Sequence, residues 1–77
     1  MKVKIIKPDA TLFEGEASLL QLPGTGGQFE IMKDHAPIVS ALSAGNIRLV
    51  TPDGEKIIAV KAGVVRGQQN DILVLAQ

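Results

Sequence analysis

The stretch Asn46–Gly63, NIRLVTPDGEKIIAVKAG, decides the fold class, because apolar residues recur with a period of two on both sides of a turn sequence. Pro52 presets φ for the turn, Asp53 can hydrogen-bond forward to the backbone, and Gly54 accepts the left-handed conformation. We therefore predict a β-hairpin in this stretch.

The rest of the chain repeats this pattern of short apolar runs and turns. Residues 63–76, GVVRGQQNDILVLA, form a second predicted hairpin, with Asn70 and Asp71 as residues that tolerate positive φ in its turn. Together the two hairpins predict four consecutive antiparallel strands. Residues 2–6, KVKII, are predicted as the first strand of the domain.

Two segments are less regular. Residues 11–22, TLFEGEASLLQL, are predicted as one long strand in which Gly15 marks a bulge or bend. Residues 36–45, APIVSALSAG, fit a short helical face as well as a strand, because their apolar residues also fall at i, i+3 and i+4. Pro37 and Gly45 leave room for only about two helical turns, and the β-rich surroundings favour a strand.

Length and composition limit the chain to one small domain over residues 1–77. Hydrophobic residues make up 45% of it, yet Phe13 and Phe29 are the only aromatic residues, so the core is expected to consist of Val, Ile, Leu and Ala. A domain of this size buries about 60% of the surface that the unfolded chain exposes, and its stability is expected to be modest.

Charge and cysteine content narrow the functional classes. Eight basic residues balance eight acidic ones, which argues against binding to nucleic acid or to an anionic membrane surface. The chain has no cysteine, which is compatible with a reducing compartment such as the cytoplasm. Lysines interrupt the apolar residues at the N-terminus, and no run approaches the roughly 18 apolar residues of a membrane span, so we expect neither a signal peptide nor direct membrane insertion.

Glycine and the only histidine crowd together in residues 23–37, PGTGGQFEIMKDHAP. A P-loop would require a lysine followed by serine or threonine after the glycines, and residues 24–29 provide neither. The dinucleotide fingerprint also fails, since its third glycine would fall at Phe29. We therefore expect a shaped turn and no cofactor.

Catalysis at His35 is also disfavoured. A hydrolytic site would combine His35 with Ser40 and an acid such as Asp34 or Glu30, but neighbouring residues of an extended chain point to opposite faces, so Asp34 cannot easily orient the His35 ring. No nucleophile elbow is present, and a metal site would need several carboxylates around the one imidazole without any spacing that indicates it. We predict no catalytic, cofactor-binding or metal-binding residues. The remaining interpretation is a loop that another protein grips.

Segments in order along the chain resemble the N-terminal domain of the epsilon subunit of F-type ATP synthase. They are FEGE at 13–16, LPGTGGQFEIMKDHAPIVSAL at 22–42, Gly45-x-x-Arg48, IIAV at 57–60 with Ala62-Gly63, and Asn70-x-x-x-Val74-Leu75-Ala76. The resemblance implies an all-β fold, a flattened β-sandwich of two antiparallel sheets with about ten short strands, in which the sheets pack face to face. This agrees with the strands and turns predicted above.

The resemblance also implies a function and partners. Such a domain is a non-catalytic part of the central stalk, where it binds the gamma subunit and rests on the c-subunit ring, so that ion-driven rotation is coupled to ATP synthesis. The implied location is the cytoplasmic face of the inner membrane, peripheral and held there through the complex. Neither a cofactor nor a nucleic acid is implied.

The implied contact residues form two sets. The loop that matches the ring-facing loop of the family is Thr25, Gly26, Gly27, Gln28 and Phe29. The segment that matches the family's contact with the gamma subunit is His35, Ala36, Pro37, Ile38 and Ser40.

The chain departs from the family pattern in sequence and in length. Family members commonly carry glycine in place of Glu30 and an acidic residue in place of Gln28. Related subunits usually continue into two antiparallel helices, whereas this chain ends one residue after Ala76, so the expectation is a coupling subunit without the helical brake or a nucleotide site. The alternative function is a free-standing β-sandwich module that binds a peptide or a carbohydrate.

Overall fold

The computed structural model describes residues 1–77, and all of its regular elements are strands. These are β1 (Lys2–Lys7), β2 (Ala10–Glu16), β3 (Leu19–Gly24), β4 (Gly27–Met32), β5 (Ile38–Leu42), β6 (Gly45–Thr51), β7 (Gly54–Val60), β8 (Gly63–Gln68) and β9 (Asp71–Ala76). The structure contains no helix that could cross a membrane. The predicted all-β class is confirmed, and the strands number nine.

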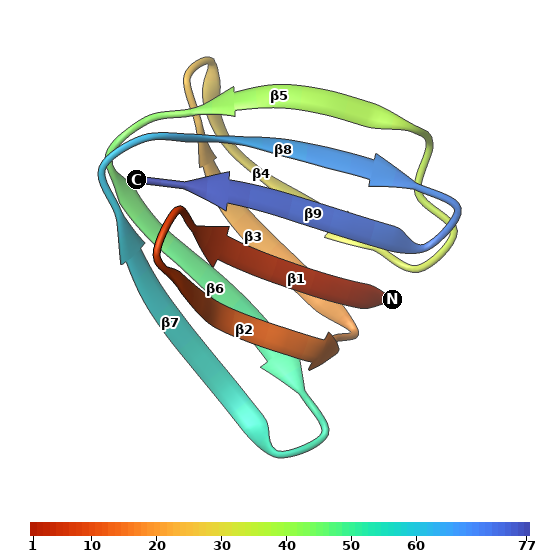
Figure 1. The fold of residues 1–77 in the computed structure, drawn as a ribbon. Coiled ribbons are helices and arrows are strands. Elements are labelled where there is room, and N and C mark those ends of the chain that lie inside the picture. The colour runs from red at the N-terminus through yellow and green to blue at the C-terminus, as the bar shows by residue number, and fades with distance from the viewer.

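The strands form two layers that cross one another (Figure 1). The hydrogen-bonded order is β2-β1-β9-β8-β5-β3-β6-β7, with β4 paired to the side of β3. We call β2-β1-β9-β8-β5 the first layer and β4-β3-β6-β7 the second layer. They are joined by one backbone pair, Gly24 with Leu42, where the sheet bends from one layer to the other.

One pairing departs from the purely antiparallel arrangement that the resemblance implies. β1 and β9, the first and last strands, run parallel, with Val3 opposite Ile72 and Ile5 opposite Val74. Parallel neighbours need a long connection between them. Here the connection is the whole intervening chain, because the first and last strands are neighbours in the middle of the first layer.

The core lies between the layers and follows from alternation along each strand. Successive side chains of a strand point to opposite faces, so the buried residues of the central strands alternate with more exposed ones. The core consists of Val3, Ile5, Ala17, Leu20, Leu22, Ile31, Leu42, Ile47, Leu49, Val60, Val65, Ile72, Val74 and Ala76. Ile58 is only half-buried because β7 is the edge strand of its layer.

The hairpin predicted for residues 46–63 is confirmed as β6 and β7. Gly54 has φ +116°, a conformation that glycine adopts without the strain a side chain would bring. The local hydrogen bonds come from Thr51, whose hydroxyl donates to the Gly54 carbonyl at 2.8 Å and accepts from the Asp53 amide at 3.2 Å. Thr51 therefore stabilises the turn in the way predicted for Asp53.

The second hairpin is also present, but the prediction of four consecutive antiparallel strands is wrong. β8 pairs with β9 and β5, and not with β7. The chain leaves the second layer at the end of β7 and enters the first layer at β8, so the two hairpins lie in different layers. The positive φ values fall at Gln69 (49°) and Asn70 (64°), one residue earlier than predicted.

The long strand predicted over residues 11–22 is divided into β2 and β3. The break lies at Ala17 and Ser18, whose amides donate to the carbonyls of Met1 and Val50, each at 2.9 Å. β2 belongs to the first layer and β3 to the second, so the chain must cross between them here. Distant partners satisfy the backbone at the crossing.

The bulge predicted at Gly15 is not there, because Gly15 lies in regular register opposite Val3. The irregularity of this pair lies three residues earlier on β2, where Leu12 is the extra residue, since Ile5 pairs with Phe13 and Ile6 with Thr11. The ambiguous segment at residues 36–45 contains β5, which confirms the preference for a strand.

Candidate functional site

The predicted ring-facing loop is the tip of the β3–β4 hairpin. Gly24 and Gly27 are its last paired residues, and Gly27 has φ +124°. Thr25, Gly26, Gly27 and Gln28 are exposed, whereas Phe29 is half-buried and packs against the core. The Phe29 ring lies so close to Gly24 that a Cβ atom there would come within 2.7 Å of it. Four of the five predicted loop residues are thus free to contact a partner.

The hairpin tip is fastened to the end of β5. The Thr25 amide donates to the Ala41 carbonyl at 3.1 Å, and the Ser43 amide and hydroxyl both donate to the Pro23 carbonyl, at 2.8 and 3.2 Å. Backbone hydrogen bonds of this kind hold the tip in a defined position on the first layer. The loop is therefore an ordered protrusion.

Glu30, where glycine is common in the family, lies in the regular part of β4 opposite Gln21. It is not among the residues with positive φ, so the backbone at this position does not require glycine. Its carboxylate accepts a hydrogen bond from Gln21 Nε2 at 3.3 Å. The substitution is thus accommodated by an ordinary strand conformation.

The predicted gamma-facing segment occupies the other end of β5. Ala36 and Pro37 are exposed, and His35, Ile38 and Ser40 are half-buried. Ile38 and Leu42, the two ends of β5, are about 13 Å apart at the ordinary strand rise. The two predicted contact sets are therefore separate, and β5 connects them.

A pair of hydrogen bonds fixes the approach to this segment. The Asp34 amide donates to Asn70 Oδ1 at 2.9 Å, and Asn70 Nδ2 donates to Asp34 Oδ1 at 3.4 Å. Both residues have φ +64°, which Asp and Asn adopt more readily than other side chains do. The Asn70 carbonyl also accepts from the Lys2 amide at 2.8 Å. Asn70 thus links the β8–β9 turn to β1 and to the residues before His35.

The His35 ring is held by backbone groups. Its Nδ1 lies 2.8 Å from the Ala36 carbonyl, and since a carbonyl only accepts, Nδ1 must carry the proton. Its Nε2 is buried without a hydrogen-bond partner. The ring packs over Gly67, where a Cβ atom would stand 3.0 Å from His35 Cε1 and 2.9 Å from Ile38 Cγ2. Gly67 therefore makes room for both side chains.

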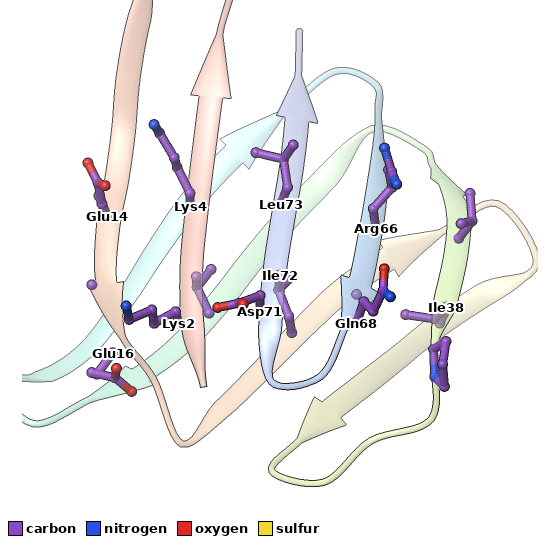
Figure 2. A pocket seen from close by; sticks show the side chains of 15 residues that line it. Lys2, Lys4, Glu14, Glu16, Ile38, Arg66, Gln68, Asp71, Ile72 and Leu73 are labelled. Carbon is purple, nitrogen blue, oxygen red and sulfur yellow. The ribbon is translucent and has the colours of Figure 1, made fainter.

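The structure adds a surface that the sequence predictions did not name. The outer face of the first layer carries a shallow groove of about 680 Å³, lined by residues of all five strands. The lining includes Pro37 and Ile38 of the predicted gamma-facing segment, and also Val39, which the prediction did not include. Figure 2 shows side chains of β2, β1, β9 and β8 along it. We call this outer face the groove face.

The groove face also exposes apolar side chains. Val39 is 74% exposed, Leu75 46% and Val64 41%. Val64 and Leu75 are direct neighbours across β8 and β9, and Ala41 continues their row onto β5. Cross-strand neighbours form a continuous surface. The sequence did contain a signal for this apolar surface, the unbroken apolar run Ile72–Ala76. A strand with one face in water alternates apolar and polar residues, and this run does not.

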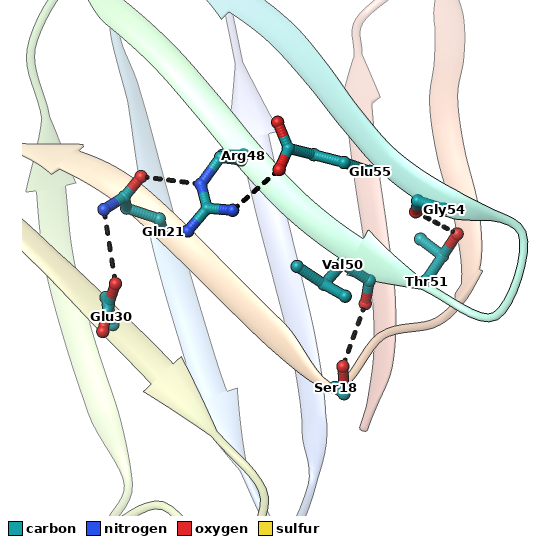
Figure 3. A network of polar contacts seen from close by, with 8 residues as sticks. All are labelled: Ser18, Gln21, Glu30, Arg48, Val50, Thr51, Gly54 and Glu55. Atoms are coloured by element: carbon teal, nitrogen blue, oxygen red, sulfur yellow. Dashed lines mark hydrogen bonds and ion pairs between the residues drawn. The ribbon is translucent and has the colours of Figure 1, made fainter.

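The outer face of the second layer is different in character (Figure 3). Arg48 donates from Nε to Gln21 at 3.1 Å and from Nη1 to Glu55 at 2.9 Å, and Gln21 in turn donates to Glu30. The network crosses all four strands of that layer and pairs its one cation, Arg48, with Glu55. The arginine of this outer face is therefore already engaged, unlike the arginine of the groove face.

Comparison with known proteins gives a consistent assignment. Residues 1–77 match the family described as ATP synthase, Delta/Epsilon chain, beta-sandwich domain. The chain is similar to the ATP synthase epsilon chain of Leptospira interrogans (35% identity, 97% of this chain, 59% of the relative) and of Bordetella parapertussis (32%, 99% and 55%). It is also similar to that of Campylobacter lari (32%, 100% and 60%). The chain spans less than two thirds of the length of these relatives.

Solved structures with the same fold are much more distant in sequence. One is from the Tetrahymena thermophila mitochondrial ATP synthase, central stalk and c ring, with a TM-score of 0.82, 11% identity, and coverage of 99% of this chain and 62% of that one. Another is from the Euglena gracilis mitochondrial ATP synthase, with a TM-score of 0.88, 12% identity, and coverage of 96% and 48%. At such low identity they establish the fold alone.

Proposed function

Since this chain belongs to the ATP synthase delta/epsilon β-sandwich domain family, we propose that it is a non-catalytic subunit of the central stalk of F-type ATP synthase. In this role it links the gamma subunit to the c-subunit ring, so that ion-driven rotation reaches the site of ATP synthesis. It sits at the cytoplasmic face of the membrane as a peripheral part of the complex.

The observation that carries the proposal is the apolar groove face next to the segment His35–Ser40. Val39, Val64 and Leu75 expose large hydrophobic side chains on a flat, rigid sheet. Fully burying a Val or Leu side chain is worth about 1.5–3 kcal/mol relative to leaving it in water. A surface of this kind favours a permanent protein partner, and the gamma subunit is the partner we assign to it.

The hairpin tip supports the assignment of a second partner at the other end of β5. Its four exposed residues project from the fold, while backbone hydrogen bonds fasten its base to Ala41 and Ser43. A force that the c-subunit ring applies at Thr25–Gln28 would therefore be transmitted directly to β5. From β5 this force would be transmitted to the groove face, because Ile38–Leu42 pair with Gly63–Gly67 residue by residue.

The proposal is tested by capture of two purified partners. The immobilised chain should retain the ATP synthase gamma subunit and, separately, the detergent-solubilised c-subunit ring, whereas an unrelated β-sandwich of similar size should retain neither. Retention of the gamma subunit alone would contradict the ring contact. Retention of neither would contradict the function itself.

Two adjacent glycines of the tip provide a matched pair of variants. Gly27→Ala is expected to weaken ring binding roughly 5-fold or more, since a side chain at φ +124° introduces backbone strain and depopulates the native turn. Gly26→Ala has ordinary φ and open space around its Cβ atom, so it should bind as the wild type does. Surface-captured c ring provides the dissociation constants. Equal affinities for the two variants would show that binding to the c-subunit ring does not depend on the backbone conformation of the hairpin tip.

The second candidate function, a free-standing module that binds a peptide or a carbohydrate, is favoured by the groove alone. Its volume of about 680 Å³ falls in the range of small-molecule and peptide sites. The groove is open and carries charged side chains from four strands, which suits a protein surface better than an enclosed ligand. Failure to capture both ATP synthase partners would make this module the preferred function.

A further inference from the structure

The charges of the groove face are arranged unevenly. Arg66 on β8, Leu73 on β9 and Lys4 on β1 are direct neighbours across the three strands, and Figure 2 shows their side chains in one row. Two strand spacings, about 10 Å, separate the backbones of the two cations. Both side chains are long enough to approach an atom group that lies above Leu73. The row is thus a half-buried apolar floor with a cation on each side.

Neither cation has a partner in the structure. The two ion pairs join the N-terminal amine to Glu16 and Arg48 to Glu55, and the side-chain hydrogen bonds of the protein do not involve Arg66 or Lys4. The contrast between the two arginines is informative. Arg48 is held by Gln21 and Glu55, whereas the guanidinium of Arg66 faces the groove with all five of its N–H donors free.

The acidic residues of the groove are kept away from Arg66. Glu14 and Glu16 lie on β2, at the far edge of the layer, and Asp71 lies at the start of β9. β5 and β8 carry no acidic residue. The strand partners of Arg66 are Val39 and Leu73, both apolar, whereas Lys4 stands opposite Glu14. No acidic residue is therefore directly opposite Arg66, and Asp71, its diagonal neighbour on β9, stands opposite Lys2 and forms no ion pair with Arg66, whereas the charge of Lys4 is offset in part by Glu14.

We infer that the groove face accepts a carboxylate of its protein partner, seated above Leu73 and bound by Arg66, with Lys4 as a second and weaker contact. The inference rests on the proposed function and therefore assigns this carboxylate to the gamma subunit. Arg binds a carboxylate through two parallel N–H···O bonds, and the apolar surroundings of Val39 and Leu73 strengthen the interaction once the partner excludes water. The same groove thus supplies both apolar contact and one oriented polar contact.

Leucine substitutions test the inference, because they enlarge the apolar surface while removing the charge. Arg66→Leu should weaken binding of purified gamma subunit about 30-fold or more, since it leaves a carboxylate buried without its partner. Lys4→Leu should weaken it by a smaller factor, about 3- to 10-fold, because Glu14 already offsets that charge. Lys56→Leu on β7 is the matched control on the second layer and should bind as the wild type does.

The outcomes distinguish a failure of the carboxylate contact from a failure of the proposed function. If the wild type binds the gamma subunit and Arg66→Leu binds equally or more tightly, the groove face is simply apolar and the carboxylate is wrong. If Lys4→Leu loses more affinity than Arg66→Leu, the assignment of Arg66 as the main contact is wrong. If the wild type does not bind the gamma subunit at all, the proposed function fails and the inference fails with it. Thermal unfolding of each variant establishes that the fold is retained.

Discussion

Val39→Glu is expected to weaken binding of the gamma subunit by about 100-fold or more while leaving the free domain folded. Val39 is 74% exposed at the centre of β5, so the free protein tolerates a charge there. In the complex a charged carboxylate would replace an apolar side chain at the contact, so the complex would lose apolar burial and would have to desolvate the new charge. Arg66 is the direct strand neighbour of residue 39, so the new side chain would also occupy the cation assigned to the partner.

The matched control is Ile57→Glu. Ile57 is 60% exposed on β7, the edge strand of the second layer, so it matches Val39 in chemistry and exposure but lies on the opposite outer face. Calorimetric titration with purified gamma subunit measures the affinity of both variants. In this titration Ile57→Glu should bind the gamma subunit like the wild type. Loss of binding in Ile57→Glu with full binding in Val39→Glu would move the gamma contact to the second layer and refute the groove face.

Leu20→Ala is expected to reduce the free energy of unfolding by about 2–5 kcal/mol, the usual range for removing a buried Leu side chain. Leu20 is fully buried on β3, and its direct strand neighbours are Ile31 on one side and Leu49 on the other, both buried as well. A domain of this length has roughly 5–15 kcal/mol of stability at most. The variant should therefore populate the unfolded state measurably at moderate temperature.

Urea unfolding followed by circular dichroism measures this effect. The midpoint should fall sharply for Leu20→Ala, whereas Ile57→Ala should change the free energy of unfolding by no more than about 0.5 kcal/mol, as exposed substitutions usually do. A small change for Leu20→Ala would mean that the layers can close the cavity by moving together. The core would then be less rigid than a torque-bearing subunit needs, which would weaken the case for a stalk role.

Much of the fold could be predicted from the sequence because its signals are local. Alternation of apolar and polar residues identifies β1 and β6, the apolar run Ile72–Ala76 identifies β9, and the residues Thr51–Gly54 are sufficient to specify a tight turn. The break at Ala17–Ser18 could not be predicted, because the groups that bond those amides are Met1 and Val50, the second of them 32 residues away from Ser18. The nearest glycine, Gly15, stands two residues before the break in regular register on β2 and does not mark the crossing.

The candidate site also has one part that could be predicted from the sequence and one part that could not. The hairpin tip at residues 25–28 was predictable, since glycines in a short turn mark a protrusion wherever the hairpin lies. The groove face was not, because it needs Arg66, Leu73 and Lys4 to be neighbours, and Lys4 and Leu73 are brought together by the parallel pairing of the two chain ends. No local pattern states which strands are neighbours.

By itself, then, the sequence determined most of the strands and turns, the alternation that fills the core and the resemblance that names the family. Those features depend on residues within a few positions of each other, where steric limits and side-chain period act directly. Only the tertiary structure decided the strand order, the parallel contact of β1 with β9 and the unpaired cations that flank Leu73. They depend on which distant surfaces bury each other best, and that choice is made by the whole chain at once.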